Sequence, residues 1–216
     1  MTFAKEAWPF VLPFLLLALA LGLLGRRGPA IAVAAVGLLV LLFFRDPRRS
    51  FSGGESMVVA PADGKVTAVE DVEDARIGPG RYRRIVTFLS VLDVHVQRAP
   101  VAGEVVLSEL VRGKKLAAFR DDIADKNERH TTVILRPSGD RIGVRQLAGL
   151  LARRVVSYLD TGDRVRRGDL LGVIKFGSRV DLYVPASYRV LVRVGERVRN
   201  GETPMAEAPP PRMPIL

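Results

Sequence analysis

Two hydrophobic patterns divide the chain. Near the N-terminus stand two apolar runs without a charge, Pro9 to Gly25 and Ala30 to Phe44, with a short basic segment around Arg26 and Arg27 between them. Each run has about 15–17 residues, at or just below the length that a straight helix needs to cross hydrocarbon. Both runs are apolar on every face, which suits lipid. They predict a helical membrane hairpin that either spans the bilayer twice or dips into one leaflet.

Two other interpretations of these runs stay open. A cleaved signal peptide is disfavoured, because Lys5 stands beside Glu6, no small-x-small cleavage site precedes Arg26, and a second apolar run follows at once. A buried hairpin in a soluble protein would be expected to carry a polar face, which neither run has.

The pattern changes after Ser50. Short runs of Val, Ile and Leu alternate with Gly, Pro and Asp, which predicts a mainly β domain of the barrel or sandwich type with few short helices. We expect a helix around 114–124, and 146–154 fits either a helix or a strand. The tail is rich in Pro and is expected to be extended or disordered. The predicted domains are the hairpin, 1–49, the β-rich domain, 50–205, and the tail, 206–216.

Two sequence patterns occur twice within the β-rich part. A-P-x-x-G-x-V occurs at 60–66 and 99–105, and x-G-[DE]-R-V-R-x-G occurs at 161–168 and 194–201. Both resemble turns of the biotinyl and lipoyl "hammerhead" barrels. Such carriers need a lysine at an exposed hairpin tip, and no Met-Lys-Met-like tip is present. The repeats therefore indicate β-architecture and argue against a carrier.

Charge and composition narrow the function classes. The formal net charge is +10, which usually means an anionic partner such as nucleic acid or an acidic membrane surface. Arg is scattered among the strands, and neither an aromatic RNA-binding signature nor a helix-turn-helix pattern is present, so the membrane is favoured and nucleic acid is not expected. The chain has no Cys and only two histidines, which excludes thiolate chemistry and disfavours a metal site.

Four polar stretches could carry chemistry: 61–64 (PADG), 93–100 (DVHVQRAP), 126–130 (KNERH) and 176–179 (FGSR). Each has an ordinary structural explanation when taken alone. Asp63 before Gly64 is typical of a turn, a single strand histidine such as His95 is usually structural, and Ser178 after Gly177 is usually a turn serine.

Together these stretches resemble the phosphatidylserine decarboxylases, in particular the short bacterial and archaeal type with an N-terminal membrane hairpin. The resemblance covers about 45–198. It depends on five motifs in the same order: R-D-P-R-R, A-P-A-D-G-K-V, F-L-S-x-x-D-V-H-V-x-R-A-P-V-x-G, K-N-E-R and F-G-S-R-V-D.

The resemblance implies that the chain cuts itself between Gly177 and Ser178. The Ser178 hydroxyl would attack the Gly177 carbonyl, and β-elimination of the ester followed by hydrolysis would turn residue 178 into a pyruvoyl group. The products would be a large chain, 1–177, and a small chain, 178–216. Asp63 and His95 are the matching partners, since a serine needs a base and a carboxylate can orient that base.

One position departs from the family pattern. Many relatives carry two histidines three residues apart in the D-x-H stretch, the second associated with self-cleavage and the first with decarboxylation. Here the first is His95 and the second position is Arg98. His95 would then serve both steps, or another group would serve one; His130 is a spare candidate.

The resemblance also implies the reaction. The pyruvoyl ketone would form a Schiff base with the serine head group of phosphatidylserine, accept the electrons as carbon dioxide leaves, and release phosphatidylethanolamine. No metal or diffusible cofactor is implied.

The charges that flank the apolar runs predict the orientation of the hairpin. A double span would put four basic residues on the side of the large domain, Lys5, Arg45, Arg48 and Arg49, and two on the other side, Arg26 and Arg27. This excess places the large domain on the cytoplasmic side of the cell membrane.

Two alternatives to this function stay open, as does a homo-oligomer. One is a membrane-anchored, non-enzymatic β-barrel adaptor. The other is a pyruvoyl decarboxylase that acts on a different amino-acid head group.

Overall fold

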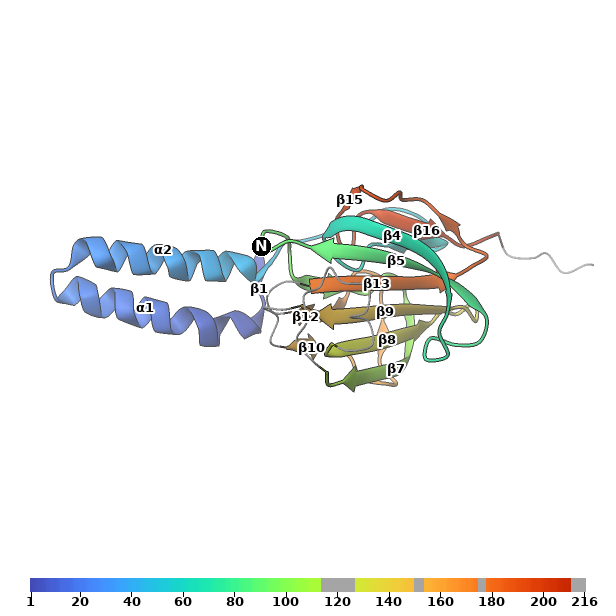
Figure 1. Ribbon diagram of the computed structural model, residues 1–216, viewed down its shortest axis with the longest axis horizontal. Coiled ribbons are helices and arrows are strands. Elements are labelled where there is room, and N and C mark those ends of the chain that lie inside the picture. Colours follow the sequence, from blue (N-terminus) through green and yellow to red (C-terminus); the bar gives the residue numbers. More distant parts are fainter. Residues whose placement is uncertain (114–126, 150–153, 175–177, 211–216) are drawn as a thin grey trace, which may run out of the picture. The chain divides into compact units, whose positions relative to one another are not determined.

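A computed structural model describes residues 1–113, 127–149, 154–174 and 178–210 (Figure 1). The chain divides into two compact units, Met1–Arg48 and Arg49–Leu216. The helix predicted around 114–124 lies outside the described residues, as do residues 150–153 of the ambiguous segment 146–154. Of that segment, Gln146 to Ala148 form the end of a strand.

The first unit is a helical hairpin. After β1 (Thr2–Phe3) and a 3₁₀ turn (Lys5–Ala7), α1 (Trp8–Leu23) and α2 (Arg27–Phe43) pack against each other, and β2 (Arg45–Asp46) pairs with β1. A Cβ on Gly37 would lie 3.0 Å from the Cβ of Phe14, so a glycine permits the close approach of the helices. By length and composition, the helical stretch Lys5–Leu23 could cross a membrane, whereas α2 is shorter. The predicted pair of apolar helices is therefore present.

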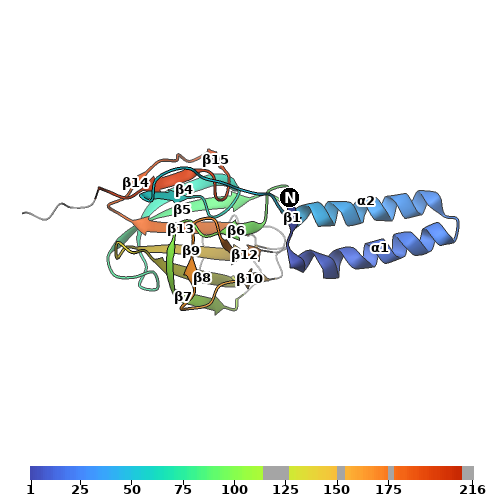
Figure 2. The ribbon, with the colours of Figure 1, turned by 180° about the vertical axis from the view of Figure 1, so that it is seen from behind.

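The second unit is built from strands. The largest sheet has the order β11-β7-β8-β9-β13-β5-β4-β15, and two three-stranded sheets have the orders β10-β12-β6 and β14-β16-β3 (Figures 1 and 2). The bounds are β3 (Met57–Val59), β4 (Gly64–Glu73), β5 (Arg81–Leu89), β6 (Val96–Arg98), β7 (Gly103–Val111), β8 (Arg129–Leu135), β9 (Arg141–Ala148), β10 (Val155–Ser157), β11 (Arg164–Val165), β12 (Leu170–Ile174), β13 (Ser178–Pro185), β14 (Arg189–Val190), β15 (Arg197–Val198) and β16 (Pro204–Glu207).

These strand orders contain an internal two-fold repeat. Each half of the large sheet reads the same from its outer edge inward, so β11-β7-β8-β9 corresponds to β15-β4-β5-β13. The small sheets correspond in the same way, β10-β12-β6 to β14-β16-β3. One repeat is continuous, from β6 to β12. The other consists of β3 to β5 and β13 to β16, with the first repeat inserted between its two parts.

The sequence repeats form the turns that join equivalent strands. Gly162 N donates to Val105 O at 2.8 Å, and Gly195 N donates to Val66 O at the same distance. Each A-P-x-x-G-x-V glycine begins a long strand against a neighbouring backbone. A Cβ would lie 2.3 Å from the Phe88 carbonyl oxygen at Gly64 and 2.2 Å from the Leu135 carbonyl oxygen at Gly103. Only glycine fits such an approach, which explains why both motifs share this residue.

The insertion determines where the two halves are joined. In the continuous repeat, β8 and β9 are connected by a tight turn between Leu135 and Arg141. The equivalent strands β5 and β13 pair in the same way, with Leu89 opposite Ser178. In place of a turn, the chain leaves this point after Leu89, builds the other repeat, and returns at Ser178. Both connections between the repeats therefore begin or end at one spot on the sheet.

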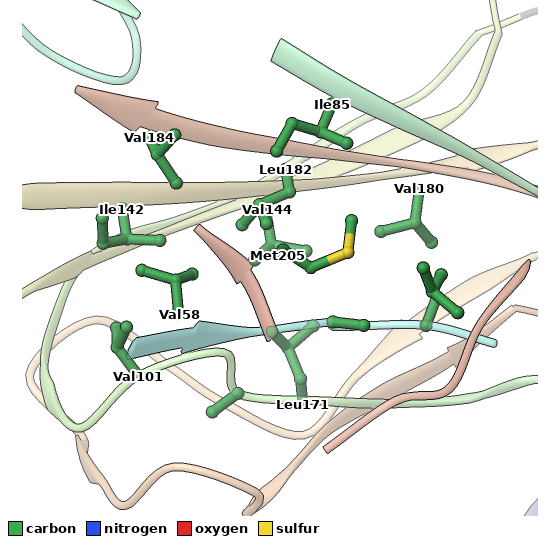
Figure 3. Packing of buried hydrophobic residues seen from close by; sticks show 14 of the residues in the cluster. Val58, Ile85, Val101, Ile142, Val144, Leu171, Val180, Leu182, Val184 and Met205 are labelled. Carbon is green, nitrogen blue, oxygen red and sulfur yellow. The ribbon is translucent and has the colours of Figure 1, made fainter. Parts of the chain in front are cut away.

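The core lies between the large sheet and the two small ones. Val144, Val180, Leu182 and Val184 of the large sheet pack against side chains such as Met205 of β16 (Figure 3). Alternate residues of β13 contribute to this core, as expected for a strand with one face buried in it. Ala206 and Glu207, at the start of the predicted tail, lie in β16.

The fold class is confirmed, since the chain has a mainly β domain and an α-helical hairpin. The division into 1–49, 50–205 and 206–216 stays a prediction.

Candidate active site

Ser178 begins β13, the strand at which the chain returns from the inserted repeat. It pairs with Leu89 of β5 on one side and with Ala148 of β9 on the other. Gly177 lies outside the described residues. The predicted cleavage point is thus followed directly by a strand with partners on both sides, in the interior of the large sheet.

His95 lies on the outgoing connection, close to the returning one. The backbone nitrogen of Ile174, the last residue of β12, donates to His95 O at 3.2 Å. Leu89 is opposite Ser178, and His95 contacts Ile174, so the two ends of the outgoing connection lie beside the described residues that flank 175–177. The insertion in the fold therefore brings His95 next to Ile174, which lies shortly before Ser178 in the sequence.

The His95 side chain is fully buried and has a defined tautomer. Its Nδ1 lies 2.9 Å from the Asp93 carbonyl oxygen. A carbonyl only accepts, so Nδ1 carries the hydrogen. In the neutral ring the lone pair is then on Nε2, the atom that can take a proton. Gln97 Nε2 also donates to His95 O at 2.7 Å, which fixes the backbone of this residue.

Asp63 lies in the turn before β4 and is held by two donors. Arg49 Nη2 donates to its Oδ2 at 2.9 Å, and the backbone nitrogen of Asn200 donates to its Oδ1 at 2.7 Å. Asn200 Nδ2 in turn donates to Val96 O at 2.6 Å. A chain of hydrogen bonds thus connects the Asp63 carboxylate with the residue that follows His95.

Comparison of the two repeats shows which residues the turns need in order to form. The position equivalent to Asp63 in A-P-x-x-G-x-V is Ala102, and the position equivalent to Asn200 in the second motif is Arg167. Both turns have the same backbone hydrogen bonds, since Gly201 N donates to Ala60 O at 2.8 Å and Gly168 N to Ala99 O at 2.9 Å. The turn therefore forms without a carboxylate, and its backbone hydrogen bonds do not require Asp63.

The K-N-E-R motif supports the strand beside Ser178. Asn127 is fully buried, and its Nδ2 donates to Ala148 O at 2.8 Å. Glu128 accepts a hydrogen bond from Val155 N at 3.0 Å through its carboxylate. Since Ala148 is the partner of Ser178, this motif positions the backbone next to the predicted cleavage point. Lys126 lies outside the described residues.

A buried ion pair follows Ser178 directly. Arg179 donates from Nε and Nη2 to the two carboxylate oxygens of Asp181 at 2.6 and 2.9 Å. Asp181 is fully buried, and burial raises its pKa, an effect opposed by Arg179, Arg84 and Arg145. The pair holds two alternate residues of β13 on the face opposite Val180 and Leu182.

Arg98 occupies the position of the second histidine, and His130 is the spare candidate for the base. Both side chains contact neighbouring strands and turns of the β domain. Arg98 Nη1 donates to Gly168 O at 2.8 Å, in the turn of the continuous repeat. His130 lies in β8 with its ring nitrogens 3.2 Å from Ser108 Oγ and 3.3 Å from Thr132 Oγ1. Burial lowers the pKa of His130, so its ring is neutral near neutral pH. Within the described residues, no group of three or more His, Asp or Glu side chains could hold a metal ion.

Comparison with known proteins gives the family. The profile described as "Phosphatidylserine decarboxylase" matches residues 36–206. The chain belongs to the phosphatidylserine decarboxylase family. A relative from Symbiobacterium thermophilum, named phosphatidylserine decarboxylase proenzyme, is 44% identical over 206 residues, covering 95% of each chain. A proenzyme of the same name from Saccharopolyspora erythraea is 45% identical over 201 residues, covering 90% of this chain and 85% of its own.

The family membership predicted from the five motifs is therefore confirmed. The roles of Asp63, His95 and Ser178 stay predictions. Arg49 and Asn200, which bind the Asp63 carboxylate, were not predicted as site residues. Arg49 lies within R-D-P-R-R, and Asn200 is the place where the second repeat departs from its copy, so a comparison of the two repeats could have found it.

Proposed function

We propose that this chain is the proenzyme of a phosphatidylserine decarboxylase, which forms phosphatidylethanolamine after cutting itself between Gly177 and Ser178. The observation that carries the proposal is the pairing of Leu89 with Ser178 together with the His95–Ile174 contact. These contacts support the proposal, because they join the stretch from Leu89 to His95 to the described residues on either side of 175–177. The names of the relatives, which include the word proenzyme, support maturation by processing.

The self-cleavage uses only groups of the chain and one water. The Ser178 oxygen attacks the Gly177 carbonyl carbon and displaces the amide nitrogen, which leaves an ester and a free amine on residue 178. Loss of the α-proton of residue 178 expels the Gly177 carboxylate and leaves dehydroalanine. Addition of water then releases ammonia and leaves a ketone at residue 178. His95 Nε2, the lone-pair nitrogen of the ring, accepts the serine proton in the first step.

The residues present fit a ketone at this position. When formed, such a group supplies an electron sink for decarboxylation of an amino acid. Position 178 is held by the β13 backbone, with partners in β5 and β9, and does not depend on the bond to Gly177 for its place. His95, which is buried, provides a group that can accept and donate a proton.

Asp63 contributes a negative charge near the D-V-H stretch. Its carboxylate binds Arg49 and, through Asn200, is connected to the backbone beside His95. A carboxylate in this place favours the protonated ring that forms when His95 accepts a proton. We propose that Asp63 acts in this way and that His95 serves both self-cleavage and decarboxylation, since Arg98 donates to the turn at Gly168.

The hairpin tethers the enzyme to the membrane that contains its substrate. The stretch Lys5–Leu23 is long and apolar enough to span a bilayer. We propose that the hairpin inserts in the cell membrane and that the β domain lies on the cytoplasmic side. The excess of Lys5, Arg45, Arg48 and Arg49 over Arg26 and Arg27 supports this orientation.

Ser178→Ala tests the proposed function. The variant lacks the attacking oxygen, so we expect a single uncut chain without decarboxylase activity, whereas the wild-type chain is cut and active. Denaturing gels and release of carbon dioxide from phosphatidylserine measure the two results. Cleavage of Ser178→Ala at the same bond would remove Ser178 from the mechanism. A wild-type chain that is cut but does not decarboxylate phosphatidylserine would show that phosphatidylserine is not the substrate.

A further inference from the structure

An exposed apolar turn directly precedes the D-V-H motif. Ser90 to Asp93 form a β-turn closed by Asp93 N donating to Ser90 O at 3.0 Å, with Val91 and Leu92 at its two central positions. The exposed fractions of these side chains are 55% and 82%. Central turn positions usually carry Gly, Pro, Asn, Asp or Ser, so two aliphatic residues at a solvent-exposed tip are unexpected on structural grounds.

Hydrogen bonds hold the backbone of the turn despite its exposure. The Asp93 carboxylate accepts hydrogen bonds from Ser90 N at 2.8 Å and from Ser90 Oγ at 2.7 Å. It also accepts a hydrogen bond from Arg197 Nη2. The side chains of Ser90, Asp93 and Arg197 therefore hold the turn.

Basic side chains stand beside the tip. Arg197 is paired with Asp93, yet 68% of its side chain is exposed. Lys65, which is exposed, pairs in register with Arg197 and with Phe88, two residues before Ser90. An apolar tip with cations beside it is typical of surfaces that bind the interface of an anionic bilayer, where apolar groups enter the acyl boundary and cations meet lipid phosphates.

We infer that the Ser90–Asp93 turn inserts Val91 and Leu92 into the leaflet that carries the substrate, with Arg197 and Lys65 on its anionic lipid head groups. This inference rests on the proposed function, in which the substrate is a membrane lipid. Leu92 precedes His95 by three residues, so a tip seated in the leaflet brings the buried histidine to the depth of the lipid head groups. The turn thus delivers the site to its substrate, separately from the tether of the hairpin.

Depth-dependent fluorescence quenching tests this insertion in the full chain. Trp8 is the only tryptophan of the sequence, so Trp8→Phe gives a background without one. In this background, Leu92→Trp is the probe and Ser138→Trp is the matched control, because Ser138 is exposed in the β8–β9 turn at the opposite end of the sheet. The proteins are reconstituted in vesicles of phosphatidylserine and phosphatidylcholine with brominated acyl chains. We expect quenching of the tryptophan introduced at position 92 and none of the tryptophan introduced at position 138. Water-like emission from position 92 without quenching would overturn the inference.

Kinetics test the role of the tip in substrate delivery. In Val91→Ser/Leu92→Ser, the Ser90 and Asp93 contacts that hold the turn are kept, and serine is favoured in turns. We expect normal self-cleavage and normal turnover of a monomeric short-chain phosphatidylserine, with KM for phosphatidylserine in vesicles raised about tenfold. Equal KM values of the variant and the wild-type enzyme in vesicles would contradict the inference. An equal loss of activity on the vesicle and short-chain substrates would contradict it as well.

Two further results would distinguish membrane insertion of the tip from a failure of the proposed function and from contact between copies of the chain. If the wild-type enzyme decarboxylates neither substrate, the proposed function fails, while the quenching result still decides whether the tip inserts. If the serine variant instead changes the mass of the detergent-solubilised protein, the tip contacts a second copy of the chain and the inference is rejected.

Discussion

At the scale of single residues, the internal repeat provides a natural control for the role of Asp63. Asp63 and Ala102 occupy equivalent places in two turns with the same backbone hydrogen bonds, and only one of these turns stands at the candidate site. A change of Asp63 to the residue of its copy should therefore leave the turn intact.

Asp63→Ala is expected to slow self-cleavage by a factor on the order of 10², as for loss of a group that assists a general base. Arg49 keeps a carboxylate partner in the variant, because its Nη1 donates to Glu202 at 3.0 Å. The fraction of cut chain is followed over time on denaturing gels, with thermal unfolding as the control for folding. Maturation at the wild-type rate in a folded variant would show that Asp63 has no part in the step.

His130 should make stability depend on pH. Burial lowers the pKa of His130, so the unfolded chain binds its proton at a higher pH than the folded chain does. The free energy of unfolding therefore falls as the pH decreases from about 6.5, the unperturbed value, towards the folded pKa. In a Ser178→Ala background, which keeps one chain, His130→Gln should reduce the loss of stability between pH 7 and pH 5. An unchanged loss in urea unfolding would contradict this assignment.

At the scale of elements, β13 depends most on contacts with its neighbours, because after the proposed cleavage it would begin with a free end between two other strands. The buried pair of Arg179 and Asp181 holds its first residues on the side away from the core. Breaking a buried pair leaves one uncompensated charge, which is far more costly than losing an exposed pair.

We expect Asp181→Asn to lower the free energy of unfolding by about 3–5 kcal/mol in the uncut Ser178→Ala chain. The matched control is Asp71→Asn, which breaks the exposed pair of Arg83 and Asp71 in the same sheet and should cost less than about 1 kcal/mol. Urea unfolding measures both. Equal losses for the two variants would show that the buried pair does not anchor β13.

The sequence predicts the elements of this molecule better than their arrangement. The uniform apolar runs identify α1 and α2, and the alternation of Val, Ile and Leu with Gly and Pro identifies a β domain. The two repeated motifs signal duplicated turns, yet they do not tell which strands pair. The insertion of one repeat between β5 and β13 depends on contacts between residues such as Leu89 and Ser178, which no local pattern encodes.

The candidate site, likewise, is only partly predictable from local sequence patterns. Ser178, His95 and Asp63 are predicted because each belongs to a motif of the family. Arg49 and Asn200 contact Asp63 only after the chain has folded, from positions 14 and 137 residues away in sequence. The apolar turn at Val91 and Leu92 lies within a family motif, but its exposure is a property of the folded chain.

At the scale of the whole molecule, the proposed small chain, 178–216, takes part in two of the three sheets of the β domain. Its strand β13 lies between β9 and β5, β15 pairs with β4, and β16 pairs with β3. A cut before Ser178 therefore leaves two chains that share one core, and we expect them to stay together until the protein is denatured.

The mass of the purified wild-type protein tests the central claim most directly. Under native conditions we predict one particle that contains both chains. Under denaturing conditions we predict a chain that ends at Gly177 and a chain from 178 to 216 that is lighter by one ammonia than the same segment with an N-terminal serine. A single intact polypeptide of 23.6 kDa in an active preparation would contradict the account.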